Sequence, residues 1–151
     1  MIGFEIDIEP VQQMRPRATR TRFGVRMYDP PKTAVFKRQL RLWVQSHYHE
    51  PPLEGPLEVE WYFFRPVQRS LSKIEHERRI SGEHLPIVKP DLSNYVKSAE
   101  DALNGVLWGD DAYITDEHMH KRYADSPGIL LKVRRASHGA RTKPGNPAGL
   151  V

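Results

Sequence analysis

The stretch Lys89–Ile114 reads KPDLSNYVKSAEDALNGVLWGDDAYI, and the other segments of the chain are arranged around it. Asp91 directly follows Pro90, at the position where a helix cap is expected. With about 100° of rotation per residue, the next residues form one apolar stripe, made of Leu92, Val96, Ala99, Leu103 and Val106. The other side is polar and carries Asn94, Lys97, Asp101 and Asn104. Gly105 can take the left-handed conformation that ends a helix. The pattern therefore predicts an amphipathic helix that starts after Asp91 and stops at Asn104.

Acidic residues stand at both ends of this helix, because Asp110 and Asp111 follow it closely. A polar helix face that carries a lysine and lies between acids is typical of a divalent-metal site for phosphate chemistry. Each feature also has an ordinary structural interpretation. An aspartate before a helix is often only a cap, Gly-Asp-Asp is often only a turn, and a polar helix face is often only solvated. The combination and its order favour the functional interpretation.

The totals describe a single soluble domain. A chain of 151 residues is long enough to bury a core, and 38% hydrophobic with 28% charged residues is an ordinary globular composition. The net charge is +4, and the absence of cysteine excludes disulfides and cysteine-ligated zinc. The N-terminus has no signal-peptide pattern and no apolar run is long enough to cross a bilayer, so we expect a cytoplasmic protein without a membrane partner.

A strongly basic segment precedes the first predicted helix. Residues 14–26 contain no acid and five arginines, namely Arg15, Arg17, Arg20, Arg22 and Arg26. We predict an exposed loop or hairpin here. It is either a solvated basic loop or an anion-binding element. Unpaired like charges repel, and guanidinium presents a planar fork to phosphate, so the composition favours contact with a nucleic-acid backbone. We assign Lys89 to the same backbone contact.

Periodicity predicts the remaining elements. Alternating apolar residues indicate strands at 4–8, 57–64, 113–122 and 129–134. A helix from about Asp29–Thr33 to His47 would bury Phe36, Leu40, Trp43, Val44 and His47. Ser72 and Glu75 have capping-box spacing, which predicts a short polar helix at 72–80 that could touch the substrate as a surface flap.

These elements predict an α+β fold, a small mixed β-sheet with helices packed on one face. The last two strands are predicted to form an antiparallel hairpin through the turn at Ser126–Gly128. His118 and His120 would share one face of their strand. They could approach a metal, although a partly exposed strand face is the more common arrangement. Residues 137–151 are rich in Gly and Pro, basic and unpatterned, which predicts a disordered C-terminal tail.

Three motifs together resemble the RusA family of Holliday-junction resolvases, in particular its phage and prophage branch. They are the Arg-Pro-Arg segment before Tyr28-Asp29-Pro30, the sequence Phe63-Phe64-Arg65-Pro66, and the block Lys89–Ile114. The similarity covers about residues 14–135 and implies a RusA-like endonuclease domain at 1–136. It implies a homodimeric enzyme, dependent on Mg²⁺ with Mn²⁺ as a possible substitute, that cuts four-way DNA junctions symmetrically.

The resemblance also implies roles for individual residues. Asp91 matches the first metal-binding aspartate of the family motif, and Asp111 matches the last, with Asp110 beside it. Lys97 matches the catalytic lysine, and Asp101 matches an acid on the same helix. Because a resolved junction needs two opposed cuts, a two-fold dimer is the natural assembly. Trp61 and Phe63 are candidate dimer contacts only if they lie outside the core.

One position departs from the family pattern, since Ser93 stands where a second aspartate is common. Asp110 or Asp101 could supply the missing carboxylate, or one Mg²⁺ could suffice, because Mg²⁺ often needs only one or two protein carboxylates. Two alternatives to the enzyme follow. The first is a catalytically weakened protein that binds branched DNA without cutting it. The second is an unrelated small nucleic-acid-binding module.

Overall fold

The computed structural model describes residues 1–137. The predicted tail at 137–151 therefore lies, apart from Ser137, outside the described residues. In chain order the elements are β1 (Ile2–Ile6), β2 (Arg17–Thr21), β3 (Gly24–Tyr28), α1 (Pro31–His47), β4 (Leu57–Pro66), α2 (Lys73–Ile80), α3 (Leu92–Leu103), a 3-10 turn (Asp111–Tyr113), β5 (Ile114–Ala124) and β6 (Gly128–Arg135). Within residues 1–137, no helix has the length and apolar character needed to cross a membrane.

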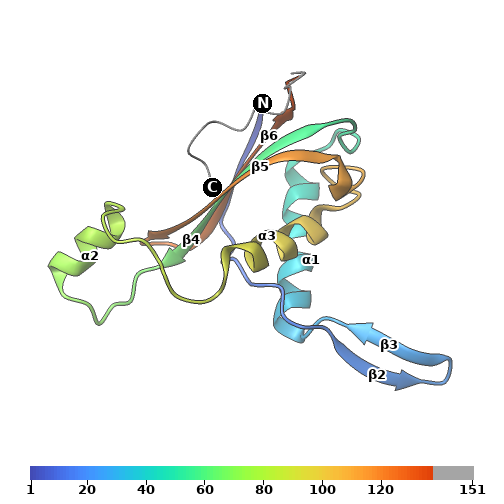
Figure 1. The fold of residues 1–151 in the computed structure, drawn as a ribbon, viewed down its shortest axis with the longest axis horizontal. Coiled ribbons are helices and arrows are strands. Elements are labelled where there is room, and N and C mark those ends of the chain that lie inside the picture. Colours follow the sequence, from blue (N-terminus) through green and yellow to red (C-terminus); the bar gives the residue numbers. More distant parts are fainter. Residues whose placement is uncertain (138–151) are drawn as a thin grey trace, which may run out of the picture.

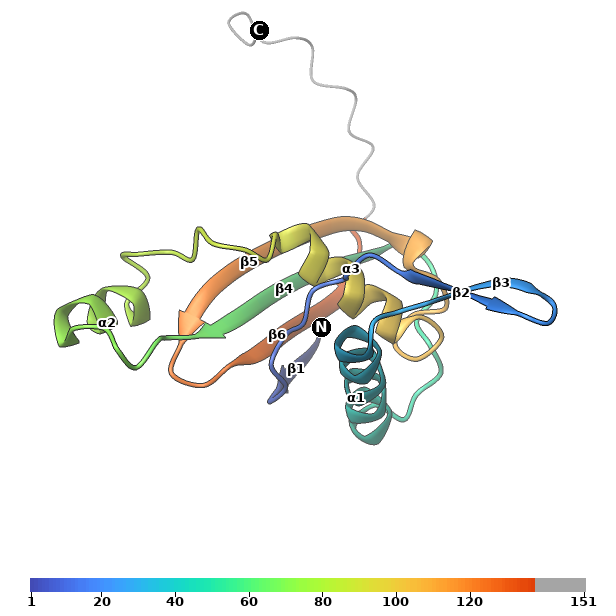
Figure 2. The ribbon, with the colours of Figure 1, turned by 90° about the horizontal axis from the view of Figure 1, so that it is seen from below.

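A four-stranded sheet in the order β1-β6-β4-β5 forms the body of the protein. β4 and β5 are parallel, whereas β4–β6 and β1–β6 are antiparallel, so the sheet is mixed. α1 and α3 pack against each other over one face of this sheet, and α2 lies apart beyond its end (Figures 1 and 2). This confirms the predicted α+β fold with a mixed sheet.

The predicted hairpin between the last two strands is wrong, because β4 lies between them. Trp61 on β4 is level with Met119 of β5 on one side and with Leu131 of β6 on the other. The turn between β5 and β6 passes over the end of β4. β4 suits the central position because its side chains are buried or half-buried almost throughout. β5 carries charged side chains and stands at an edge, where charge discourages pairing with a further strand.

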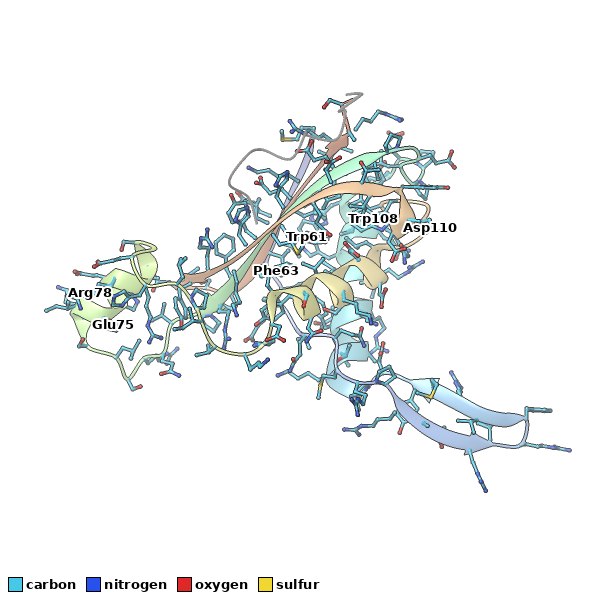
Figure 3. All side chains as sticks on the ribbon, viewed as in Figure 1. Trp61, Phe63, Glu75, Arg78, Trp108 and Asp110 are labelled. Carbon is cyan, nitrogen blue, oxygen red and sulfur yellow. The ribbon has the colours of Figure 1, made fainter. Side chains whose placement is uncertain are left out.

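The core lies between the sheet and the two helices. Trp61 and Phe63 are fully buried on β4, and both lie with Trp108 between the sheet and the helices (Figure 3). They are therefore not dimer contacts. The predicted apolar stripe of α3 faces the same core, with Leu92 only half-buried.

The predicted buried side of α1 is confirmed at Phe36, Leu40 and Val44. Trp43 is half-buried, and the prediction for His47 is wrong. His47 is the last residue of α1, and its exposed ring stacks on Trp43 with 3.8 Å between ring centroids instead of entering the core.

Two further elements confirm their predictions. The basic segment forms the β2–β3 hairpin, a separate two-stranded sheet that projects from the body as an arm (Figure 1). α2 is capped by Ser72, whose hydroxyl accepts a hydrogen bond from the Glu75 backbone N–H at 3.2 Å.

Candidate functional site

Asp91 stands at the N-terminal end of α3 without capping it. Its side chain accepts no hydrogen bond from the helix backbone. Instead one carboxylate oxygen lies 2.6 Å from Lys89 Nζ, and this hydrogen bond holds the pKa of Asp91 below its usual value. Both side chains are exposed, so the carboxylate remains accessible. The Asp91 side chain therefore does not cap the helix, and its functional role stays a prediction.

Cations from the sheet hold the loop that leads into α3. Lys121 Nζ on β5 donates to the carbonyl oxygens of Val88 and Pro90 at 2.7 and 2.9 Å. Arg65 on β4 donates to the carbonyl oxygen of Lys89. Burial and the neighbouring Arg65 lower the pKa of Lys121. This end of the helix thus combines one carboxylate with three cationic side chains, an arrangement suited to gripping phosphate.

Asp110 and Asp111 lie at the other end of α3. Asp110 accepts a hydrogen bond from the backbone N–H of Ala112 at 2.8 Å, so it caps the 3-10 turn and the turn interpretation holds for this residue. The side chains of Asp110 and Asn104 lie beside the Asp111 carboxyl and both influence its pKa. Burial, followed by the hydrogen bond to Asp110, raises the pKa of Asp111. The second aspartate is thus held in a crowded acidic environment.

Glu100 and Glu117 join this acidic cluster, and neither was singled out from the sequence. Burial raises the pKa of Glu100 to about 9, with further contributions from its hydrogen bond to Glu117 and from the charge of Asp111. Glu117 in turn accepts a hydrogen bond from Trp61 Nε1 at 2.8 Å. Glu100 could have been identified from the sequence, because it lies one helical turn after Lys97. No sequence pattern marks Glu117, because only the pairing of β5 with β4 brings it beneath α3.

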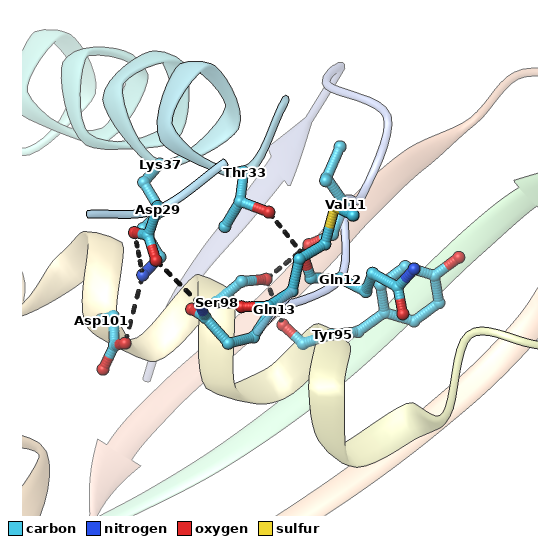
Figure 4. Close-up of polar contacts among 10 residues, drawn as sticks. Val11, Gln12, Gln13, Asp29, Thr33, Lys37, Tyr95, Ser98 and Asp101 are labelled. Carbon is cyan, nitrogen blue, oxygen red and sulfur yellow. Dashed lines mark hydrogen bonds and ion pairs between the residues drawn. The ribbon is translucent and has the colours of Figure 1, made fainter. Parts of the chain in front are cut away.

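Lys97 and Asp101 have different environments along α3. Lys97 is exposed and makes no hydrogen bond or ion pair within residues 1–137. Asp101 lies 3.3 Å from Lys37 on α1, which also binds Asp29 at 2.8 Å (Figure 4). Asp101 therefore helps to join α3 to α1. Ser93 is exposed, close to Asp91.

The two aspartates expected to share a metal ion are separated by the length of the helix. α3 has 12 residues, which corresponds to about 18 Å. Asp91 directly precedes its first residue, whereas Asp111 lies beside Asn104, which directly follows its last residue. In the described part of the chain, no three His, Asp or Glu side chains are arranged to hold a metal ion. The donors around Asp111 are nevertheless carboxylate and carboxamide oxygens, which suit Mg²⁺ or Mn²⁺. Burial and the neighbouring carboxylates raise the pKa of Asp111 and Glu100, and a cation there would relieve the repulsion between these carboxylates.

His118 and His120 lie elsewhere. They approach Glu58 and Glu60 of β4, at 3.4 and 3.5 Å, on the side of the sheet that the helices leave open. His120 also stacks on Tyr62, with 4.2 Å between ring centroids. The structure supports the strand-face interpretation of this pair and separates it from the acidic cluster.

The predicted basic contact is the β2–β3 arm. All residues of both strands are exposed, as are Arg15 and Arg22. None of the five arginines forms a salt bridge within the described residues. The segment that leads into the arm is tied to α3 through Gln13, whose backbone N–H donates to the carbonyl oxygen of Asn94 at 2.8 Å. The Gln13 side chain also donates to Asp29, just before α1, at 2.9 Å (Figure 4). The arm thus presents unneutralised positive charge from a base fixed beside α3.

Comparison with known proteins covers this whole region. A family model described as Endodeoxyribonuclease RusA matches residues 7–134, which include the arm, α3 and both groups of acids. The chain is also 35% identical over 138 residues to the uncharacterized protein YqaN of Bacillus subtilis (strain 168), an alignment that covers 90% of this chain and 97% of that protein.

Proposed function

Because the chain belongs to the RusA family of endodeoxyribonucleases, we propose that it resolves four-way DNA junctions by paired, symmetric, Mg²⁺-dependent hydrolysis of phosphodiester bonds. The observation that carries this proposal is the polar side of α3. Lys97 lies on this side and makes no hydrogen bond or ion pair in the described residues. It stands between Asp91, whose side chain does not cap the helix, and the carboxylate of Asp111, which lies among other acids. We assign this activity to the cytoplasm of a bacterium or of a phage-infected cell.

Asp111 and Asp110 would hold the metal ion at one end of α3, and Glu100 and Glu117 would supply the carboxylates that Ser93 does not. A bound Mg²⁺ polarises the phosphate and lowers the pKa of an attacking water. Lys97 would stabilise the negative charge that develops on the phosphate. The arginines of the arm and Lys89 would grip the backbone, so affinity should fall steeply with salt.

A dimer fits both the reaction and the geometry. Paired cuts need two sites related by a two-fold axis. One protomer holds Asp91 and Asp111 at opposite ends of α3, so an ion bound by both would lie between two copies. The proposed assembly is therefore a homodimer, in which Asp91 of one copy serves the site of the other.

Cleavage of a synthetic four-way junction, with Mg²⁺ or with EDTA, tests the proposal. The wild-type chain should make paired symmetric nicks that need Mg²⁺. Asp111→Asn should not cut but should bind the junction at least as tightly, because the change removes negative charge near phosphate. Asp116→Asn is the matched control and should cut normally, because this exposed side chain on β5 makes its only side-chain hydrogen bond within residues 1–137 with Thr115. Loss of binding in Asp111→Asn would show a structural role instead.

Thermal unfolding tests the metal site independently of cutting. A ligand that binds only the folded state stabilises it in proportion to RT ln(1 + [L]/Kd). Mg²⁺ should therefore raise the Tm of the wild type and of Asp116→Asn. It should leave the Tm of Asp111→Asn unchanged, and an equal rise in all three would place the ion elsewhere.

Two observations favour a second candidate, a branched-DNA-binding protein with weakened catalysis. Ser93 removes one charge, and no three-ligand metal group is preformed within residues 1–137. Tight junction binding without any cutting in Mg²⁺ or Mn²⁺ would identify this protein. Equal affinity for a junction and for linear duplex would instead indicate a general nucleic-acid-binding module.

A further inference from the structure

The tip of the β2–β3 arm presents an aromatic side chain to solvent. Thr21 pairs with Gly24, so Arg22 and Phe23 form the connecting turn. The Phe23 side chain is 93% exposed. A phenylalanine held in water forgoes the favourable burial that its ring would gain in a core or an interface. Its position therefore indicates a contact with another molecule.

Hydrogen bonds give the tip a defined shape. The Thr21 hydroxyl donates to the carbonyl oxygen of Gly24 at 2.9 Å and accepts from the backbone N–H of Phe23 at 3.3 Å. Gly24 has a φ of +122°, a conformation that L side chains rarely adopt. The ring is thus carried on a specific turn.

The apolar surface of the arm continues from the tip along β3. Val25 and Met27 are 68% and 60% exposed, and both point to the same face of the hairpin. A two-stranded hairpin alone is marginally stable in water. The arm therefore has an exposed aromatic tip, free charge and little packing of its own, as expected of an element whose tip contacts a ligand.

The charge of the arm identifies that ligand as an anionic polymer. Five arginines without a salt bridge in the described residues are distributed along the arm, and Arg20 and Arg22 lie nearest to the aromatic tip. Nucleic acid offers phosphates for guanidinium groups and base faces for an aromatic ring. In continuous duplex the base faces are covered by their neighbours. At a branch point the stacking is interrupted, and an apolar side chain can enter as a wedge.

We propose that Phe23 inserts at the branch point of a four-way junction and stacks on an exposed base while the arginines of the arm hold the adjacent phosphates. This inference rests on the proposed function and makes the tip the part of the protein that distinguishes branched from linear DNA. Each strand of the arm has five residues and spans about 17 Å. The tip therefore contacts a part of the junction that is distinct from the phosphates bound along α3.

The test uses a four-way junction with 2-aminopurine at the branch point, in EDTA so that it stays uncut. The fluorescence of this base rises when it is unstacked from its neighbours and is quenched against an aromatic ring. Wild type and Phe23→Trp should change the signal on binding. Phe23→Ala should leave the signal unchanged and bind the junction at least about fivefold more weakly, as expected for the loss of one base–aromatic stack. Affinity for linear duplex should stay the same.

Val25→Ala is the matched control, because it removes an exposed apolar side chain from the same arm without changing its charge. It should behave as wild type. Since Phe23 is exposed, Phe23→Ala should keep the wild-type Tm.

Three results would overturn the wedge. The first is a Phe23→Ala variant with the signal change and junction affinity of wild type. The second is an equal loss of junction affinity in Val25→Ala. The third is a shift of Phe23→Ala from dimer to monomer in sedimentation, which would make the tip a contact between copies. If the wild type cuts junctions normally, these results leave the proposed function intact. A wild type that does not prefer junctions over duplex refutes both.

Discussion

Glu100→Gln should remove a pH-dependent destabilisation from the folded protein. Burial and the neighbouring Glu117 raise the pKa of the Glu100 carboxyl from its ordinary value of 4.5 to about 9. In the unfolded chain this carboxyl loses its proton near pH 4.5. Between these two values the folded state holds one proton more than the unfolded state. Stability therefore falls as pH rises through this window.

The size of the effect follows from the burial of Glu100. If the folded state fully retained this proton, the free energy of unfolding would fall by about 1.4 kcal/mol for each unit that the pH rises between these two pKa values. Glu100 is only part-buried, so water screens its repulsion with Glu117 and Asp111. We therefore expect Glu100→Gln to be more stable than wild type by about 1–2 kcal/mol at pH 8.5 and equal to it at pH 5.

Urea unfolding in EDTA at a series of pH values measures this difference. Glu77→Gln, an exposed change on α2, is the control for loss of one glutamate charge and should track the wild type. Glu100→Gln could instead show the same pH dependence as wild type, or be less stable at pH 8.5. Either result would show that Glu100 does not retain its proton and would refute its placement in a crowded acidic cluster.

Three further outcomes are expected. Arg20→Ala should reduce the slope of log affinity against log salt by about 0.9 on duplex DNA, measured by fluorescence anisotropy, and an unchanged slope would show that the arm misses the backbone. Lys97→Met should slow single-turnover cutting by about 10²–10³-fold with junction affinity nearly kept, whereas normal cutting would leave this lysine without a catalytic role. Trp61→Phe should cost about 2 kcal/mol in urea unfolding, because it leaves a gap and removes the donor to Glu117, and a cost under about 0.5 kcal/mol would contradict that contact.

The sequence by itself determined the local elements. The 3.6-residue stripe after Asp91 marked α3, and the alternation at 57–64 marked β4, because burial on one side imposes these periods. The arm was also predictable, since five arginines without an acid cannot lie in a core. His47 shows the limit of the approach, because a helical period does not reveal where a helix runs past the core.

Only the tertiary structure decided which elements meet. Strand pairing depends on contacts between residues far apart in the chain, and the short turn at Ser126–Gly128 favoured the wrong neighbour for β5. The parallel pairing of β5 with β4 places Glu117 beside Glu100 and thereby creates the acidic cluster. The rigid length of α3 keeps Asp91 from Asp111, although the linear motif suggested one site. Side chains of one motif share a site only when the fold brings them within contact distance, and a straight helix of 12 residues holds its two ends apart.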